Sequence, residues 1–93
     1  MDELRGDEAG QAGALVEAAA AADGVAPLSE HALLALRAGR GGLVVRDGGA
    51  VAGYAHFDPA ADGEPAAGEL VVHPEFRRRG HGRALLRALR EKA

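Results

Sequence analysis

The stretch ELVVHPEFRRRGHGRALLRAL, residues 69–89, decides the fold of this chain. It begins with an apolar run typical of a strand, continues through Gly80 and Gly82, and ends in the apolar spacing of a helix. Glycine lets the backbone come close to a ligand, and the first N–H groups of a helix lack intrahelical acceptors. Because these groups also lie at the positive end of the helix dipole, the stretch predicts an anion site with phosphate as its occupant.

The spacing of this glycine loop excludes two common nucleotide-binding motifs. A Walker loop requires a lysine directly after its second glycine, and the chain has no lysine before Lys92. A dinucleotide fingerprint requires a third glycine where Leu85 stands, and an acidic ribose partner about 20 residues further on. What remains is Arg-x-x-Gly-x-Gly directly after an apolar strand, which Arg77, Gly80 and Gly82 match.

This motif, in the order strand, proline, loop and helix, resembles the GCN5-related N-acetyltransferases (GNAT). The resemblance implies that loop amides hold the pyrophosphate of acetyl-CoA and that the preceding strand holds the pantetheine arm through its main chain. A backbone N–H near Val71 or Val72 would polarise the thioester carbonyl. The implied cofactor-binding residues are Leu70, Val71, Val72, Arg78, Arg79, Gly80, His81, Gly82 and Arg83.

Three segments, 23–30, 69–74 and 77–82, show a narrower resemblance to the mycothiol synthase family. The Ala-, Gly- and Arg-rich composition without isoleucine agrees with the actinobacterial origin of that family. The resemblance implies two tandem acetyltransferase modules and transfer of acetyl to the cysteinyl amine of desacetylmycothiol. Glu30 would bind this substrate, although a carboxylate just after Ser29 also favours a helix N-terminus electrostatically.

The catalytic groups stay open at this point. Glu69 and His73 are candidate general bases, with His56 and Glu30 as alternatives, and each has a structural reading as a strand-edge, loop, surface or helix-start residue. The proton donor in this fold is often a tyrosine from the second half of the domain, whereas the one tyrosine here is Tyr54. We therefore expect the 93-residue chain to bind acetyl-CoA weakly and not to turn over.

Two expectations concern the histidines. The side chain of His81 is expected to point outward rather than to donate to a phosphate. No two histidines have metal-ligand spacing with a third ligand, so no metal site is predicted.

Periodicity and turn signals predict helices over 7–22 and 29–38, strands over 43–46, 50–57 and 67–72, and a final helix from residue 84. Asp47-Gly48-Gly49 predicts a hairpin, and residues 58–65 predict a mobile loop. In the final helix Leu85, Leu86 and Leu89 are expected to pack inward, with Arg87 and Arg90 outside. The fold class is α+β: part of the GNAT fold, a mainly antiparallel three-stranded sheet with two helices before it and one after.

The family fold continues with a strand, a helix and two further strands, so residues 1–93 are expected to form a single incomplete N-acetyltransferase domain. The last predicted strand then has one free edge, and an unpaired apolar edge invites association. We expect a second module, a dimer, a swapped partner or poor solubility.

Composition limits the other function classes. Residues 1–69 carry four basic and twelve acidic side chains, whereas residues 70–93 carry seven basic and two acidic, so positive charge gathers around the glycine loop. The acidic remainder and only three aromatic residues disfavour nucleic-acid binding. The chain has no cysteine, no secretion signal and no apolar stretch that could span a bilayer, so a cytoplasmic location is expected. Two alternatives remain: an acetyltransferase for another amine, or a non-catalytic acyl-CoA-binding or structural module.

Overall fold

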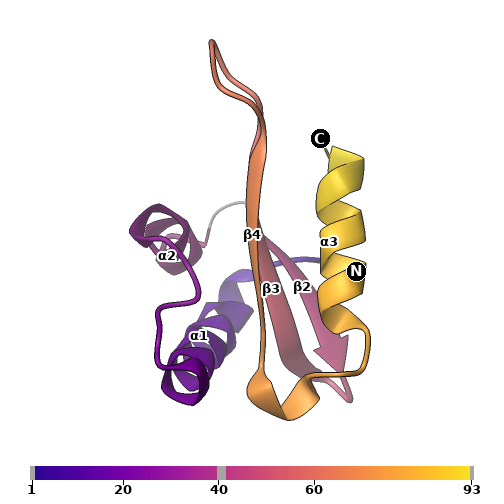
Figure 1. The fold of residues 1–93 in the computed structure, drawn as a ribbon. Coiled ribbons are helices and arrows are strands. Elements are labelled where there is room, and N and C mark those ends of the chain that lie inside the picture. The colour runs from indigo at the N-terminus through magenta and orange to yellow at the C-terminus, as the bar shows by residue number, and fades with distance from the viewer. Residues whose placement is uncertain (1, 40–41, 93) are drawn as a thin grey trace.

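Four antiparallel strands form the centre of the molecule, and helices cover both faces of this sheet (Figure 1). The computed structural model describes residues 2–39 and 42–92. In chain order the elements are β1 (Asp2–Glu3), η1 (Gly6–Glu8), α1 (Ala9–Asp23), α2 (Glu30–Arg37), β2 (Gly42–Asp47), β3 (Ala50–Asp58), β4 (Ala67–Val72), η2 (Pro74–Phe76) and α3 (His81–Lys92). The predicted α+β class is confirmed, and β4 has the predicted bounds.

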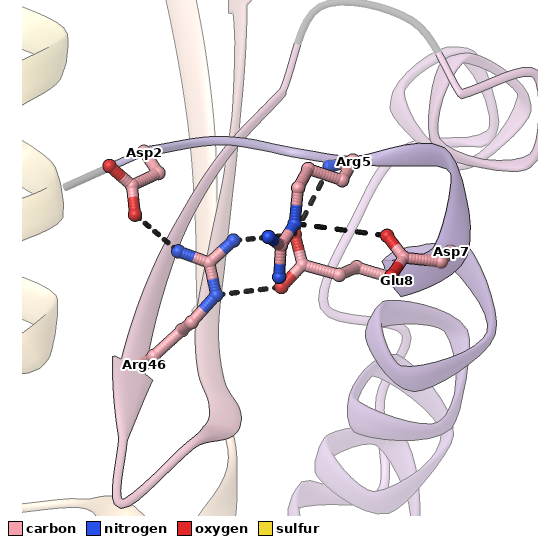
Figure 2. A network of polar contacts seen from close by, with 5 residues as sticks. All are labelled: Asp2, Arg5, Asp7, Glu8 and Arg46. Atoms are coloured by element: carbon pink, nitrogen blue, oxygen red, sulfur yellow. Dashed lines mark hydrogen bonds and ion pairs between the residues drawn. The ribbon is translucent and has the colours of Figure 1, made fainter.

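The predicted three-stranded sheet is wrong by one strand, because β1 pairs with β2 through Asp2 and Val44 and through Glu3 and Leu43. Two acidic residues have no apolar alternation that would signal a strand. An ion-pair network holds this segment instead (Figure 2). Arg46 of β2 donates to Asp2, and its Nε and Nη2 donate to the Glu8 carboxylate at 2.7 and 2.6 Å.

Glu8 is the centre of that network, and only 3% of its surface is exposed. The hydrogen bonds from the Arg46 side chain are the main cause that lowers the pKa of Glu8 to about 2, and Arg5 contributes through its backbone N–H. The carboxylate therefore stays ionised at neutral pH, since its negative charge is matched by a bidentate guanidinium.

Two tight turns shape the sheet. Gly48 and Gly49 have φ of +60° and +87°, as a two-residue β-hairpin turn of type I′ requires, so the predicted hairpin is confirmed. Residues 58–65 are not an irregular loop: Asp58 pairs with Ala67 and Ala61 pairs with Glu64. They extend the β3–β4 hairpin into the narrow projection seen in Figure 1.

Each face of the sheet has its own hydrophobic cluster. On the α1 and α2 face, Leu15, Leu36, Val44 and Tyr54 are almost fully buried. On the α3 face the buried residues are Ala55, Leu85 and Leu89. Leu86 was expected to pack inward, but it is 41% exposed, because α3 contacts the sheet along a narrower stripe than the leucine spacing suggests.

Gly53 sets how closely α3 approaches the sheet. A Cβ at this position would lie 2.8 Å from Cδ1 of Leu85 and 2.9 Å from Cγ1 of Val45. A side chain there would therefore push α3 away from β3. None of the helices in residues 2–39 and 42–92 is long and apolar enough to cross a membrane.

Candidate phosphate and cofactor site

The glycine loop lies where β4 ends and α3 begins, with the single turn η2 between them. It borders a surface pocket of about 620 Å³. The residues that line this pocket are Val72, Phe76, Arg77, Arg78, Gly80, His81, Gly82 and Arg83. Most of the residues predicted to hold a pyrophosphate thus surround one hollow at a strand-to-helix junction.

Helix α3 begins at His81, one turn earlier than the expected start at Ala84. Its first intrahelical bond runs from the Ala84 N–H to the Gly80 carbonyl at 3.0 Å. By helix geometry, the N–H groups of residues 80–83 therefore have no intrahelical acceptor. These are the backbone donors that a phosphate at a helix N-terminus requires.

The loop backbone has two residues in the left-handed region. Gly80 has φ +83° and Arg78 has φ +67°, and Arg78 is the one residue other than glycine with positive φ in residues 2–39 and 42–92. For arginine this conformation costs roughly 1–2 kcal/mol. Such outliers are concentrated at binding sites, where the surrounding structure holds them in place.

The main chain of β4 has one edge free of strand partners among the described residues. The His73 N–H donates to the Ala52 carbonyl at 2.8 Å, and antiparallel bonding alternates along the strand from this point. By this register, Val71 bonds toward β3, whereas Leu70 and Val72 direct their N–H and C=O groups to the free edge. The Val72 carbonyl there accepts from Nε of Arg77 at 3.4 Å. The three residues predicted to hold pantetheine are therefore not equivalent.

Arg77 and Arg79 hold the loop in place. Arg77 makes a bidentate pair with Asp23 at the end of α1, with distances of 2.8 and 2.7 Å, and this pairing lowers the pKa of Asp23. Arg79 donates to Asp47 at 3.0 Å and lies over the Phe76 ring, 5.5 Å from its centre. These two guanidinium groups are thus engaged by the protein itself.

Asp47, at the end of β2, is a site residue that the sequence suggested only as a turn former. Its Oδ2 lies 2.9 Å from Nε2 of His81 and 3.0 Å from Nη1 of Arg79. The hydrogen bond from His81, followed by that from Arg79, lowers the pKa of Asp47. The expected outward orientation of His81 is therefore wrong: its side chain is 16% exposed and points to the β2–β3 hairpin.

Arg78 and Arg83 line the same pocket and make no ion pair with any other residue in the described part of the chain. The loop thus combines two engaged arginines that fix its shape with two that remain available to an anion. An electropositive hollow with backbone donors suits a pyrophosphate.

Residues 11–93 match the model of the acetyltransferase (GNAT) family. This chain belongs to the GNAT family. It is 63% identical over 93 residues to a mycothiol acetyltransferase of Thermomonospora curvata, an alignment that covers 99% of this chain and 31% of that protein. Acetyltransferases of this family use acetyl-CoA.

Two further proteins of the same name are similar. The one from Kineococcus radiotolerans is 54% identical over 85 residues, covering 86% of this chain and 28% of that protein. The one from Streptosporangium roseum is 50% identical over 82 residues, covering 84% and 24%. This GNAT chain spans less than one third of the length of each of these relatives.

The two candidate bases of this GNAT chain both have structural partners. The carboxylate of Glu69 accepts from the Ser29 N–H at 2.7 Å and from the Ser29 hydroxyl at 2.6 Å. Nδ1 of His73 accepts from the Glu75 N–H at 3.1 Å and so caps η2. Both side chains therefore hold a turn or a helix start in this structure.

Tyr54 is also unsuited to release a proton at the cofactor. Its ring is fully buried against α1 and α2, and burial, followed by the charge of Glu69, raises the pKa of its hydroxyl. Glu30 is the exposed first residue of α2, and no hydrogen bond or ion pair holds its carboxylate within residues 2–39 and 42–92.

The fold brings three ligand-type side chains together, although the sequence spacing predicts no metal site. They are His31 of α2 with His56 and Asp58 of β3, whose ligand atoms lie within 4.8 Å of one another. Residues 31 and 56 come from separate elements, so their proximity depends on how α2 packs on the sheet.

Proposed function

We propose that this chain binds acetyl-CoA, with the pyrophosphate at residues 78–83 and the pantetheine arm along the free edge of β4. One observation carries the proposal: the free first-turn N–H groups of α3 share one pocket with Val72, whose N–H lies on the same free edge of β4 as the main-chain groups of Leu70. Coenzyme A carries a doubly charged diphosphate joined to an arm with two amides. The same junction offers donors for the first and strand-like pairing for the second.

The experiment is a calorimetric titration of the chain with acetyl-CoA, coenzyme A and ADP. We expect both thioester and free thiol forms to bind, and ADP to bind more weakly because it lacks the arm that pairs with β4 and also the 3′-phosphate of coenzyme A. Equal affinity for ADP would show that the strand edge takes no part.

Gly80→Val is the matched test of the loop. Valine at φ +83° costs about 1–3 kcal/mol, so we expect affinity for coenzyme A to fall roughly tenfold to a hundredfold. Gly63→Val is the control, because Gly63 has a similar φ of +75° but lies in the exposed turn beyond β3. If both variants lose affinity equally, the glycine loop is not the binding site.

For the longer enzyme to which this chain corresponds, we propose acetyl transfer to the cysteinyl amine of desacetylmycothiol. The identity to proteins named mycothiol acetyltransferase supports this acceptor. The amine nitrogen attacks the thioester carbon, the C–S bond breaks, and the thiolate gains a proton while the amine loses one. The attacking amine must be neutral, so a proton acceptor is needed.

A second reading applies to the 93 residues alone: they bind acyl-CoA and do not turn over. The structural roles of Glu69 and His73 favour it, since neither is free to accept the amine proton. We expect no acetylated product after incubation of the chain with acetyl-CoA and desacetylmycothiol. Product formation at a rate that scales with chain concentration would overturn this reading.

A variant of Glu30 tests whether desacetylmycothiol is the acceptor of the longer enzyme. Its carboxylate is exposed, and a carboxylate accepts hydrogen bonds from hydroxyls or an amine. Glu30→Gln should raise KM for desacetylmycothiol and leave KM for acetyl-CoA unchanged. The companion measurement is kcat/KM for a panel of unrelated amines. A value for one of them that is comparable to that for desacetylmycothiol would favour a different acceptor.

We also propose that residues 1–93 are part of one acetyltransferase domain and that the free edge of β4 pairs with further polypeptide. That polypeptide is either more of the same protein or a second copy of this chain. If a second copy covers the edge, sedimentation equilibrium of the chain should show association, and a stable monomer at all concentrations would contradict this pairing.

A further inference from the structure

His31, His56 and Asp58 form a compact polar cluster away from the glycine loop. Nε2 of His56 lies 2.9 Å from Oδ1 of Asp58, and Nε2 of His31 lies 3.1 Å from the same oxygen. The imidazole rings meet edge to face with centres 5.4 Å apart. Two imidazoles and one carboxylate thus converge on one point between α2 and β3.

Two of the separations in this cluster are near those of ligands around a single ion. Ligand atoms about 2.1 Å from one ion, at tetrahedral or octahedral angles, lie roughly 3.0–3.4 Å apart. Two of the three separations are close to this range, and the third is at most 4.8 Å. His31 is 71% exposed, so its side chain can rotate to shorten the remaining distance without moving the core.

The cluster combines one ligand that packing holds in place with two ligands that are exposed to solvent. The side chain of His56 is only 7% exposed, so packing fixes its ring, whereas Asp58 is 42% exposed. An ion held here would keep positions open to water on the solvent side.

The tautomer of His56 does not oppose metal binding. Nδ1 of His56 is buried and has no hydrogen-bond partner among the described residues. In one tautomer Nε2–H donates to Asp58, and the lone pair of Nδ1 has no donor. In the tautomer that binds an ion through Nε2, the proton is on Nδ1, and this N–H has no acceptor. Nδ1 is without a partner in both states, and ion binding exchanges the Nε2 hydrogen bond to Asp58 for a bond to the ion.

We propose that His31, His56 and Asp58 bind one divalent transition-metal ion, with Zn²⁺ or Ni²⁺ as the class, and that the ion links α2 to β3. Two imidazoles with one carboxylate suit such ions, whereas Mg²⁺ and Ca²⁺ prefer oxygen ligands throughout. The proposal is independent of acetyl-CoA binding. An ion at this place stabilises the packing of α2 on the sheet, since it binds the folded chain alone.

The test is calorimetric titration of the untagged 93-residue chain with ZnCl₂, NiCl₂ and MgCl₂. We expect one equivalent of Zn²⁺ or Ni²⁺ to bind, no Mg²⁺, and the thermal midpoint to rise with Zn²⁺ concentration. His31→Ala should weaken Zn²⁺ binding roughly tenfold or more, since even the loss of an outer-shell partner costs that much. Asp58→Asn should also weaken Zn²⁺ binding, because an amide oxygen is a poorer metal ligand than a carboxylate. The amide oxygen still accepts hydrogen bonds from the histidines.

The matched controls are His73→Ala and Asp62→Asn, which remove the same residue types outside the cluster. His31 is exposed, so its variant should fold, and circular dichroism checks this. The proposal fails if no Zn²⁺ or Ni²⁺ binds, or if the cluster and control variants bind equally well.

Discussion

The two faces of the sheet differ in how completely they are covered. Among the residues that the structure describes, eleven buried ones form one cluster on the α1 and α2 face, whereas the α3 face has three buried residues with several half-buried ones around them. The α1 and α2 face, called the closed face below, stabilises the fold. The less covered face carries the start of α3 and its glycine loop, which adjoin the free edge of β4.

The largest expected effect tests the closed face. Leu15→Ala removes an almost fully buried side chain and should lower the free energy of unfolding by about 2–5 kcal/mol. Leu86→Ala on the other face should change it by less than about 0.5 kcal/mol, since Leu86 is partly exposed. Urea unfolding followed by circular dichroism measures both, and equal losses would contradict the difference between the faces.

The next effect concerns the attachment of β1 and η1 to β2. Glu8→Gln should destabilise the chain at neutral pH, because Arg46 loses its buried charged partner and keeps only the exposed Asp2. The pKa of Glu8 is about 2 in the folded chain against 4.5 for an ordinary glutamate, so the stabilisation is complete above pH 4.5. It declines as pH falls from about 4.5 toward about 2.

Thermal melts of wild type and Glu8→Gln across this pH range check the prediction, with exposed Glu17→Gln of α1 as the control. A difference in melting temperature that stays constant down to low pH would count against the role of Glu8.

Arg78→Gly separates the contribution of Arg78 to stability from its contribution to coenzyme A binding at the glycine loop. Glycine removes the left-handed strain of Arg78 at some entropic cost, so a net gain of about 0.5–1 kcal/mol is expected. Affinity for coenzyme A should fall at the same time, because an available cation is lost from the pocket. Arg37→Gly at the end of α2 is the comparison, because glycine there relieves no strain and should only destabilise the chain. Lys92→Gly is less suitable, because Lys92 lies in α3, the helix next to the pocket. Loss of stability in Arg78→Gly would show that Arg78 is not strained.

The smallest effect is that of Asp47. Asp47→Asn keeps an oxygen that accepts from His81 and Arg79 but removes a negative charge beside the pocket. Affinity for coenzyme A should rise by roughly twofold to fivefold, and more at low salt. Asp47→Ala removes the acceptor as well and should bind more weakly than Asp47→Asn. Calorimetry at two salt concentrations measures this, and identical affinities would exclude a role for Asp47 in ordering the loop.

Local patterns predicted the elements well because their signals are local. The glycine pair after Asp47 led to the hairpin, and Ser29 is confirmed as the cap of α2, accepting from the Ala32 N–H at 3.2 Å. Helix α3 begins earlier than the apolar spacing predicts, because Gly80 rather than Gly82 is the residue in the left-handed conformation. Strand β1 had no apolar signal and depends on the distant Arg46.

The sequence by itself determined the class of the fold and the presence of a glycine loop between β4 and α3, since periodicity, turn residues and glycine spacing act over a few neighbouring residues. The tertiary structure alone decided which side chains are engaged. Asp23 meets Arg77, Asp47 meets His81, and His31 meets Asp58 across 54, 34 and 27 positions of the chain. Such pairings depend on how helices pack on a sheet, and no local pattern encodes that packing.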